Sequence, residues 1–141
     1  MIKEFQSQYR WLSNFYPVVI EYEGRKYPSV EHAYMSVKST DIKWKLKCAD
    51  PNNSPGYIKR ESRKVQLLLN WEEVKENVMF TCLLNKFTQE PFMTQLKETF
   101  GQHIQEGNNW GDKYWGVDLK TGEGKNVLGN LIMKIRDEIL L

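Results

Sequence analysis

The stretch from Tyr27 to Lys38 constrains the fold of this chain more than any other. Pro28 stops strand pairing and Ser29 is a favourable helix N-cap, so the sequence predicts a strand that runs directly into a helix ending near residues 39–40. Apolar residues recur along that helix at positions i, i+3, i+4 and i+7: Val30, Ala33, Tyr34 and Val37. This spacing is typical of a helix face that packs on a core.

Glu31 and Lys38 lie off that face and point in the same direction, because seven residues make nearly two helical turns. Their backbones would be roughly 10 Å apart at about 1.5 Å rise per residue, and the lysine side chain leans back toward the helix N-terminus. The two charges can therefore share a site. On spacing alone a structural interpretation is favoured, with Glu31 placed by the helix dipole and Lys38 solvated.

The 141 residues have the size of one domain, and we expect a single domain over residues 1–141. Hydrophobic residues at 40% and charged residues at 27% exclude a disordered or fibrous chain, while 13% aromatic residues indicate a site that stacks planar rings. A net charge of +2 is too small for a protein that coats nucleic acid. The basic run 59–64 is a solvated helix face by default, and its alternative is a phosphate or diphosphate site.

The cysteine and histidine residues do not match a metal-binding pattern. Cys48 and Cys82 are far apart in sequence, and His32 and His103 do not complete a zinc site with them. We therefore expect reduced cysteines, no metal and no cofactor. The charged start of the chain and the lack of a long apolar run lead us to expect no signal peptide, no membrane span and a cytoplasmic location.

Helical periods and turn residues predict an α+β chain that is mainly helical, with a small β-sheet or hairpin. The hairpin is expected at 18–27 and a further strand at 103–105. Helices are expected at about 42–46, 56–66, 70–87 and 91–100, and after the glycine-rich turn 121–126. The last helix would bury one apolar face made of Leu128, Leu131, Ile132, Ile135 and Ile139.

Several polar and aromatic residues have two interpretations. Asn14, inside an aromatic run, is either a loop brace or a ligand contact. Trp71, at a helix start, is a core anchor by default and a stacking platform in the functional interpretation. The segment 108–118, with two Trp-Gly steps and no helical period, is typical of a functional loop, and the helix after Asn126 offers amide groups to a phosphate.

Taken together, these motifs resemble the NADAR superfamily of YbiA-like N-glycosidases over nearly the whole chain. Three blocks carry the resemblance: Leu12–Tyr16 with Tyr27–Tyr34 and Lys38; Arg63–Val65 with Trp71, Val74, Lys75, Met79, Lys86 and Phe87; and Glu106–Asn108, Trp110–Asp112, Trp115–Val117, Gly124, Asn126, Leu128, Gly129, Met133 and Arg136. The chain departs from the common pattern at Ser62, Leu68 and Asn70, where relatives often have Gly, Arg and Asp, and it lacks an aspartate just before Trp110.

The resemblance implies an α+β, mainly helical enzyme that cleaves a C1–N bond between ribose and a base. Similar proteins act on phosphoribosylated pyrimidine intermediates of riboflavin synthesis, and others remove ADP-ribose from guanine in nucleotides or DNA. It also implies that Glu31 is the essential acid/base and that Trp71 and Trp110 lie in the site.

For the catalytic step we expect Glu31 to stabilise an oxocarbenium-like ribose or to accept a proton from water. Lys38 has two open roles, as a Schiff-base nucleophile toward an opened ribose or as a counterion for Glu31. Asp112 is expected to orient water or the base. Substrate contacts are expected from Asn14, Tyr34, Arg63, Lys64, Trp71, Asn108, Trp110, Trp115, Lys125 and Asn126.

Substrate choice stays open between ADP-ribosylated guanine, which the compact chain without a fused deaminase or reductase favours, and a riboflavin-pathway intermediate. ADP-ribosylated DNA is a further possible partner, and we expect a monomer. A module that binds ADP-ribose without cleaving it is the rival from another class, and Glu31 argues against it because binding phosphates gains nothing from a buried carboxylate. A purely structural protein fits least with the polar residues inside each aromatic block.

Overall fold

The computed structural model describes residues 1–141, which form two compact units. One unit is Asn14–Lys86, and the other combines Met1–Ser13 with Phe87–Leu141. The class is α+β and mainly helical, with two sheets of two strands each, as the sequence predicts. That residues 1–141 make one domain stays a prediction. Every helix is too short or too polar to cross a membrane.

The unit Asn14–Lys86 begins with a β-hairpin. Strands β1 (Ile20–Tyr22) and β2 (Arg25–Tyr27) pair antiparallel with Ile20 opposite Tyr27. Glu23 and Gly24 make the turn with φ of 49° and 79°, the left-handed conformation that tight hairpin turns require. The hairpin predicted at 18–27 is confirmed, with a first strand shorter than expected.

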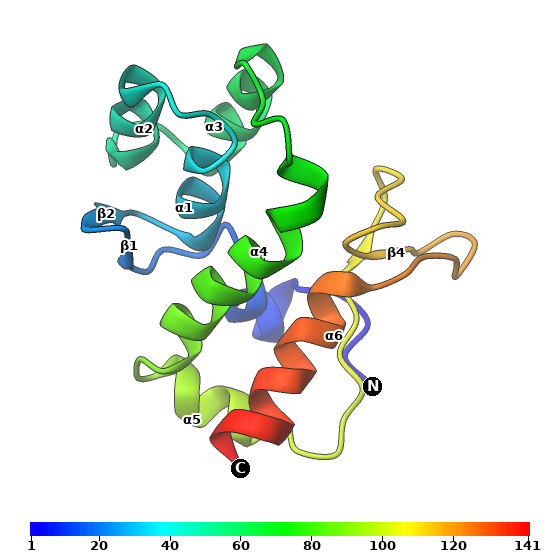
Figure 1. The fold of residues 1–141 in the computed structure, drawn as a ribbon. Helices are drawn as coiled ribbons and strands as arrows, with labels where there is room; N and C mark the ends of the chain where they lie inside the picture. The colour runs from blue at the N-terminus through cyan, green and yellow to red at the C-terminus, as the bar shows by residue number, and fades with distance from the viewer. The chain divides into compact units, whose positions relative to one another are not determined.

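Helix α1 (Val30–Ser36) follows the hairpin directly, as predicted. The Ser29 hydroxyl accepts a hydrogen bond from the His32 amide at 3.2 Å and so caps the helix. All seven residues of α1 are buried, because the hairpin, α2 (Ile42–Ala49) and α3 (Pro55–Glu61) all pack around it (Figure 1). The helix is thus the centre of this unit and carries even its polar residues into the interior.

Two helices of this unit end earlier than the sequence predicts. Helix α1 ends at Ser36, so Lys38 lies just beyond it, although the Lys38 amide still donates to the Met35 carbonyl at 3.2 Å. The helix expected at 56–66 stops at Glu61 and tightens into a 3₁₀ turn, η2 (Ser62–Lys64). The Ser62 hydroxyl bonds back to the Lys59 carbonyl at 2.7 Å, a local bond that competes with continuation of the helix. The long helix α4 (Trp71–Phe87) begins where predicted.

The unit made of Met1–Ser13 and Phe87–Leu141 has short elements joined by loops. In chain order they are the 3₁₀ helix η1 (Ser7–Leu12), α5 (Phe92–Lys97), β3 (Gly107–Asn108), β4 (Val117–Asp118), α6 (Val127–Lys134) and the π-helical η3 (Ile135–Leu140). Strands β3 and β4 pair parallel, with Gly107 opposite Val117. The strand expected at 103–105 is only one parallel bridge between Ile2 and Ile104, in which the Ile2 amide donates to the His103 carbonyl at 2.8 Å and the Ile2 carbonyl accepts from the Gln105 amide at 2.9 Å.

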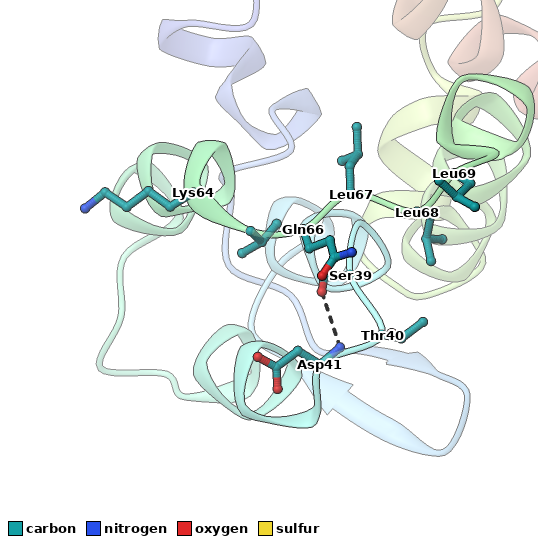
Figure 2. Close-up of a pocket in the computed structure, with 9 residues that line it drawn as sticks. Ser39, Thr40, Asp41, Lys64, Gln66, Leu67, Leu68 and Leu69 are labelled. Atoms are coloured by element: carbon teal, nitrogen blue, oxygen red, sulfur yellow. Dashed lines mark hydrogen bonds between the residues drawn. The ribbon is translucent and has the colours of Figure 1, made fainter.

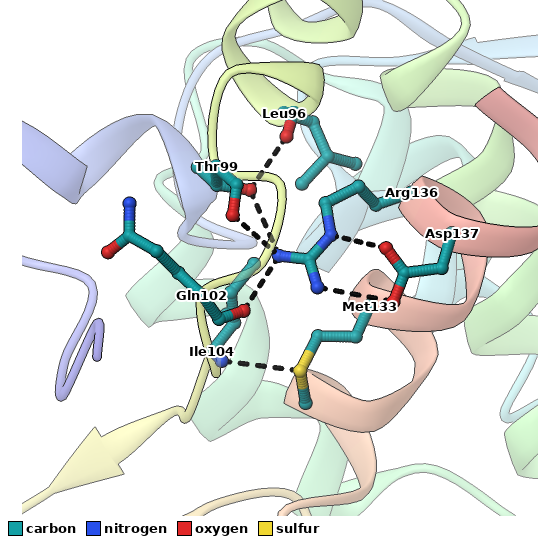
Figure 3. A network of polar contacts seen from close by, with 7 residues as sticks. All are labelled: Leu96, Thr99, Gln102, Ile104, Met133, Arg136 and Asp137. Carbon is teal, nitrogen blue, oxygen red and sulfur yellow. Dashed lines mark hydrogen bonds and ion pairs between the residues drawn. The ribbon is translucent and has the colours of Figure 1, made fainter. Parts of the chain in front are cut away.

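Arg136 ties the C-terminal helix to the turn after α5 (Figure 3). Its guanidinium is 3% exposed and donates to the Thr99 carbonyl at 3.0 Å and to the Gln102 carbonyl at 2.8 Å. Asp137 accepts from Nε of the same group at 2.7 Å. Of the apolar face predicted for the last helix, Leu128 and Ile132 in α6 and Ile135 in η3 are buried. Leu131 is only half-buried, and Ile139 is 46% exposed because it lies in the last turn of the chain.

Candidate active site

Glu31 is a carboxylate held inside the unit Asn14–Lys86. The residue is 6% exposed, and its amide donates to the Asn14 carbonyl at 3.0 Å, which fixes the first turn of α1 against the preceding loop. Burial raises the pKa of the Cys48 and Cys82 thiols to about 12, and the nearby charge of Glu31 adds to that rise in both. A carboxyl group in the interior is costly in stability when it is ionised, and such groups are typical of functional sites.

Lys38 lies within the electric field of Glu31, as the sequence predicts, although it lies past the end of α1. Burial lowers the pKa of Lys38, and the Glu31 carboxylate opposes that shift. Lys59, Lys75 and Arg63 lower the same pKa further through their positive charges. One acid and four cations therefore share this region of the unit.

Trp71, which lies beside Lys38, packs against a second aromatic ring. The rings of Tyr34 and Trp71 have centroids 5.2 Å apart at an angle of 55°, and each residue is 4% exposed. The Lys38 ammonium is 6.0 Å from the centre of the Trp71 ring, within cation–π range. Trp71 is thus a core anchor, the interpretation favoured from sequence, and it also borders the charged group. Its part in stacking a base stays a prediction.

Asn14 combines a structural bond with an unused acceptor. Its amide nitrogen donates to the Met79 sulfur at 3.5 Å, while its Oδ1 is buried and accepts no hydrogen bond from the protein. A buried amide oxygen without a donor costs about 1–3 kcal/mol, so such atoms usually serve a ligand or water. The main chain of the same residue positions Glu31. Asn14 therefore fits both the brace and the ligand contact considered from sequence.

The cations around Glu31 are only partly those expected from sequence. Arg63 is among them, but Lys64 has a side chain that is 75% exposed and pairs with Glu61 at 3.0 Å. Lys59, 6.0 Å from the Phe15 ring, belongs to the basic run 59–64 that the sequence offered as a phosphate site, whereas Lys75 was not expected as a site residue. The signal for Lys75 lies in its spacing, because four residues after Trp71 a side chain of α4 returns to the same helix face.

The loop 108–118 belongs to the other unit and is built around Asn108. Its side chain donates to the Asp112 carbonyl at 2.9 Å and accepts from the Asp112 amide at 3.0 Å. The Asp112 carboxylate in turn accepts from the amides of Tyr114 at 3.0 Å and Trp115 at 2.9 Å. These bonds make Asn108 and Asp112 organisers of the loop. A catalytic part for Asp112 and substrate contacts by Asn108 and Trp115 stay predictions.

Asn126 and its neighbours hold the turn before α6. The Asn126 side chain bridges the Glu106 amide and the Ile104 carbonyl, both at 2.9 Å, and its backbone is left-handed with φ of 52°. The Lys125 ammonium lies 5.6 Å from the Tyr114 ring, and Trp110 is 61% exposed. Asn126 is therefore a loop brace, whereas Lys125 and Trp110 present surface to solvent. Contacts of these residues with substrate stay predictions.

The histidine in α1 has a structural role. His32 shares a 2.6 Å hydrogen bond between its Nδ1 and the Ser29 hydroxyl, and its Nε2 bonds to the Asn53 carbonyl at 2.7 Å. Burial lowers its pKa, so the neutral ring is favoured. Cys48 and Cys82 are free and buried.

A buried acid and a desolvated lysine beside aromatic rings, on a mainly helical α+β frame, define a candidate hydrolase site. The model of the NADAR domain matches residues 2–140. The chain therefore belongs to the NADAR domain family.

Similar proteins and a solved structure agree with this assignment. The chain is 33% identical over 131 residues to a protein named N-glycosidase YbiA from Shigella boydii, covering 92% of this chain and 81% of that protein. It is 32% identical over 132 residues to a riboflavin biosynthesis protein of Vibrio vulnificus, covering 92% of this chain but 35% of that protein. The NMR structure of the Escherichia coli protein YbiA superposes with a TM-score of 0.83 at 30% identity, covering 99% of this chain and 86% of that one.

Proposed function

We propose that this protein is an N-glycosidase that hydrolyses the C1–N bond between a ribose and a base, and that its substrate is ADP-ribosylated guanine in a nucleotide or in DNA. N-glycosidase activity in general is supported by family membership and by the names of the relatives. The observation that carries the proposal is the buried Glu31 carboxyl group in the field of Lys38. The Lys38 ammonium lies 6.0 Å from the Trp71 ring and also feels the charges of Lys59, Lys75 and Arg63.

Cleavage of an N-glycosidic bond places positive charge on the ribose and negative charge on the departing base. In the proposed step the C1–N bond breaks, the bonding electron pair leaves with the base, and a water oxygen forms the new bond to C1. Glu31 stabilises the oxocarbenium-like ribose and accepts the proton that the water releases, and that proton then neutralises the base. A positioned acid/base group of this kind typically contributes about 10²- to 10⁴-fold in rate.

The cations suit a substrate that carries phosphates. Lys75 pairs with Glu72 at 2.9 Å, and the three remaining positive groups, Lys38, Lys59 and Arg63, still exceed what one carboxylate needs for neutralisation. Lysine and arginine are the usual partners of phosphate oxygens. A diphosphate beside the ribose would engage more of this charge than a single phosphate. This excess of charge supports ADP-ribose over a simple phosphoribosyl group.

Lys38 has two possible roles in this step. Burial lowers its pKa, which increases the neutral amine that a Schiff base with an opened ribose would need, while the Glu31 charge favours the ammonium form of a counterion. Borohydride added during turnover distinguishes them. A mass increase on the peptide containing Lys38 supports the covalent route, and an unmodified peptide supports direct attack by water.

The second candidate substrate is a phosphoribosylated intermediate of riboflavin synthesis. It is favoured by the relatives named riboflavin biosynthesis proteins in Vibrio vulnificus and Zea mays, of which this chain spans 35% and 23%. The purified protein is incubated separately with ADP-ribosylated guanosine and with the ribosylaminopyrimidine phosphate, and products are separated by chromatography. Release of ADP-ribose from the first supports our proposal. Turnover of the second alone would overturn the choice of substrate, and turnover of neither would overturn the activity.

A further inference from the structure

A groove of about 490 Å³ lies in the unit Asn14–Lys86, and Figure 2 shows the residues that line it. Two segments line it, Ser39–Asp41 between α1 and α2, and Lys64–Leu69 between η2 and α4. The Leu68 amide donates to the Lys38 carbonyl at 2.8 Å and so fastens the two segments together. This volume is within the range of about 300–1,000 Å³ that is usual for small-molecule sites.

Both lining segments are continuous with cations of the candidate active site. Ser39 follows Lys38 directly, and Lys64 follows Arg63 directly. Consecutive Cα atoms are about 3.8 Å apart, so the groove begins within one residue of Lys38 and of Arg63, two cations of the candidate active site. A ligand whose phosphates bind at Lys38 and Arg63 can therefore extend into the groove.

The groove itself suits a neutral group rather than another phosphate. Its one cation, Lys64, pairs with Glu61 at 3.0 Å and extends away from the other lining residues in Figure 2. The Asp41 carboxylate, which accepts from the Lys43 amide at 2.9 Å through one oxygen, would repel an anion. It can accept hydrogen bonds from hydroxyl or amino groups with its other oxygen.

The opposite segment offers apolar surface for a planar ring. Leu67, Leu68 and Leu69 line the groove in succession, and Leu67 is 46% exposed while Leu69 is fully exposed. Ser39, Thr40 and Gln66 add hydrogen-bonding groups around them. The lining is therefore mixed, with hydroxyl, amide and carboxylate groups beside leucine side chains. A nucleoside presents both a planar ring and hydrogen-bonding groups, and such a lining can meet both.

We propose that this groove is a nucleoside subsite, which binds the adenosine of ADP-ribose while the diphosphate lies at Lys38 and Arg63. The inference rests on the proposed function, because only an ADP-ribosyl substrate has a second nucleoside to place there. With this subsite, the site around Glu31 could accept an ADP-ribosyl compound, which is larger than a phosphoribosyl compound. A phosphoribosyl compound has no second nucleoside, so it would not reach the groove and its affinity would not depend on the groove residues.

The test uses the full chain with AMP as the probe and inorganic phosphate as the comparison. Leu67→Asn and Leu69→Asn remove apolar surface at exposed positions without adding charge, and Leu46→Asn, at a residue that is 55% exposed on α2, is the matched control. We expect AMP to shift the amide NMR signals of Ser39–Asp41 and Lys64–Leu69. The Kd for AMP should rise about tenfold in either groove variant and stay within twofold in Leu46→Asn, with phosphate affinity unchanged throughout.

Each outcome decides the proposal. AMP that does not bind, that shifts signals elsewhere, or that binds both groove variants as it binds the wild type would overturn the subsite. Loss of self-association or of a protein partner in those variants, with AMP affinity unchanged, would assign the leucines to a protein interface instead. If AMP binds in the groove but ADP-ribosylated guanosine is not cleaved, the proposed function fails and the subsite stands. If the substrate is cleaved but the groove variants show normal KM, the subsite alone fails.

Discussion

Lys86 gives a prediction whose size follows from the structure. Its side chain is fully buried in α4, 5.9 Å from the Tyr16 ring, and burial lowers the pKa of its ammonium from 10.5 to about 7. That difference in pKa between the unfolded and folded chains lowers the free energy of unfolding by about 5 kcal/mol at pH values below 7. Because the unfolded chain binds the proton more tightly, stability rises with pH between about 7 and 10.5. From pH 7 to 8.5 the gain is about 2 kcal/mol.

The contribution of Lys86 is separated from that of other groups by the pH interval and by a variant. Burial raises the pKa values of Cys48 and Cys82 from 9.0 to about 12. These thiols therefore lower the free energy of unfolding only as the pH rises above 9. The pKa of Lys38 is also lowered by burial, and its contribution has the same sign as that of Lys86. A comparison of the wild type with Lys86→Met removes the Lys86 contribution alone.

The assay is urea denaturation at pH 7.0, 7.5, 8.0 and 8.5 for wild type, Lys86→Met and the exposed control Lys26→Met. We expect the free energy of unfolding to rise by about 2 kcal/mol in the wild type and in Lys26→Met, and by about 2 kcal/mol less in Lys86→Met. An equal rise in all three proteins would refute the conclusion that Lys86 releases its proton on folding.

Two further predictions concern the site and its support. Ser29→Ala removes the cap of α1 and the partner of His32, and should lower the free energy of unfolding by about 1–2 kcal/mol in urea denaturation, whereas a change below about 0.3 would show that the cap contributes little. Arg63→Gln should raise the KM for a phosphate-bearing substrate about tenfold in initial-rate assays, since it removes one charge-assisted contact, while Lys26→Gln should leave it within twofold. Equal KM values in both variants would remove Arg63 from the site.

The local fold around α1 could be predicted from sequence because its signals are local. Ser29 is a capping residue, Pro28 ends the strand, and the Glu23-Gly24 pair suits the left-handed turn of the hairpin. The end of α1 and the break after Glu61 could not be predicted as readily. At both places the helix ends in a local hydrogen bond that many sequences can form. The Lys38 amide donates to the Met35 carbonyl, and the Ser62 hydroxyl donates to the Lys59 carbonyl.

The candidate site was predicted in part. Glu31 and Lys38 were paired from spacing, and the structure places Lys38 in the field of Glu31 even though it lies beyond the helix. The burial of Glu31 was not predictable, because it depends on three elements that pack around α1. Asn126 had the polar character of a ligand contact, but tertiary structure uses both ends of its amide to brace backbone groups.

The catalytic assignment of Glu31 is tested most directly by the rate of Glu31→Gln, with Glu21→Gln on the exposed strand β1 as its control. Both proteins are given ADP-ribosylated guanosine and the ribosylaminopyrimidine phosphate, and thermal denaturation verifies that each is folded. We predict that Glu31→Gln loses about 10²- to 10⁴-fold in kcat on the accepted substrate while Glu21→Gln keeps wild-type kcat. A folded Glu31→Gln protein with wild-type kcat would contradict the assignment.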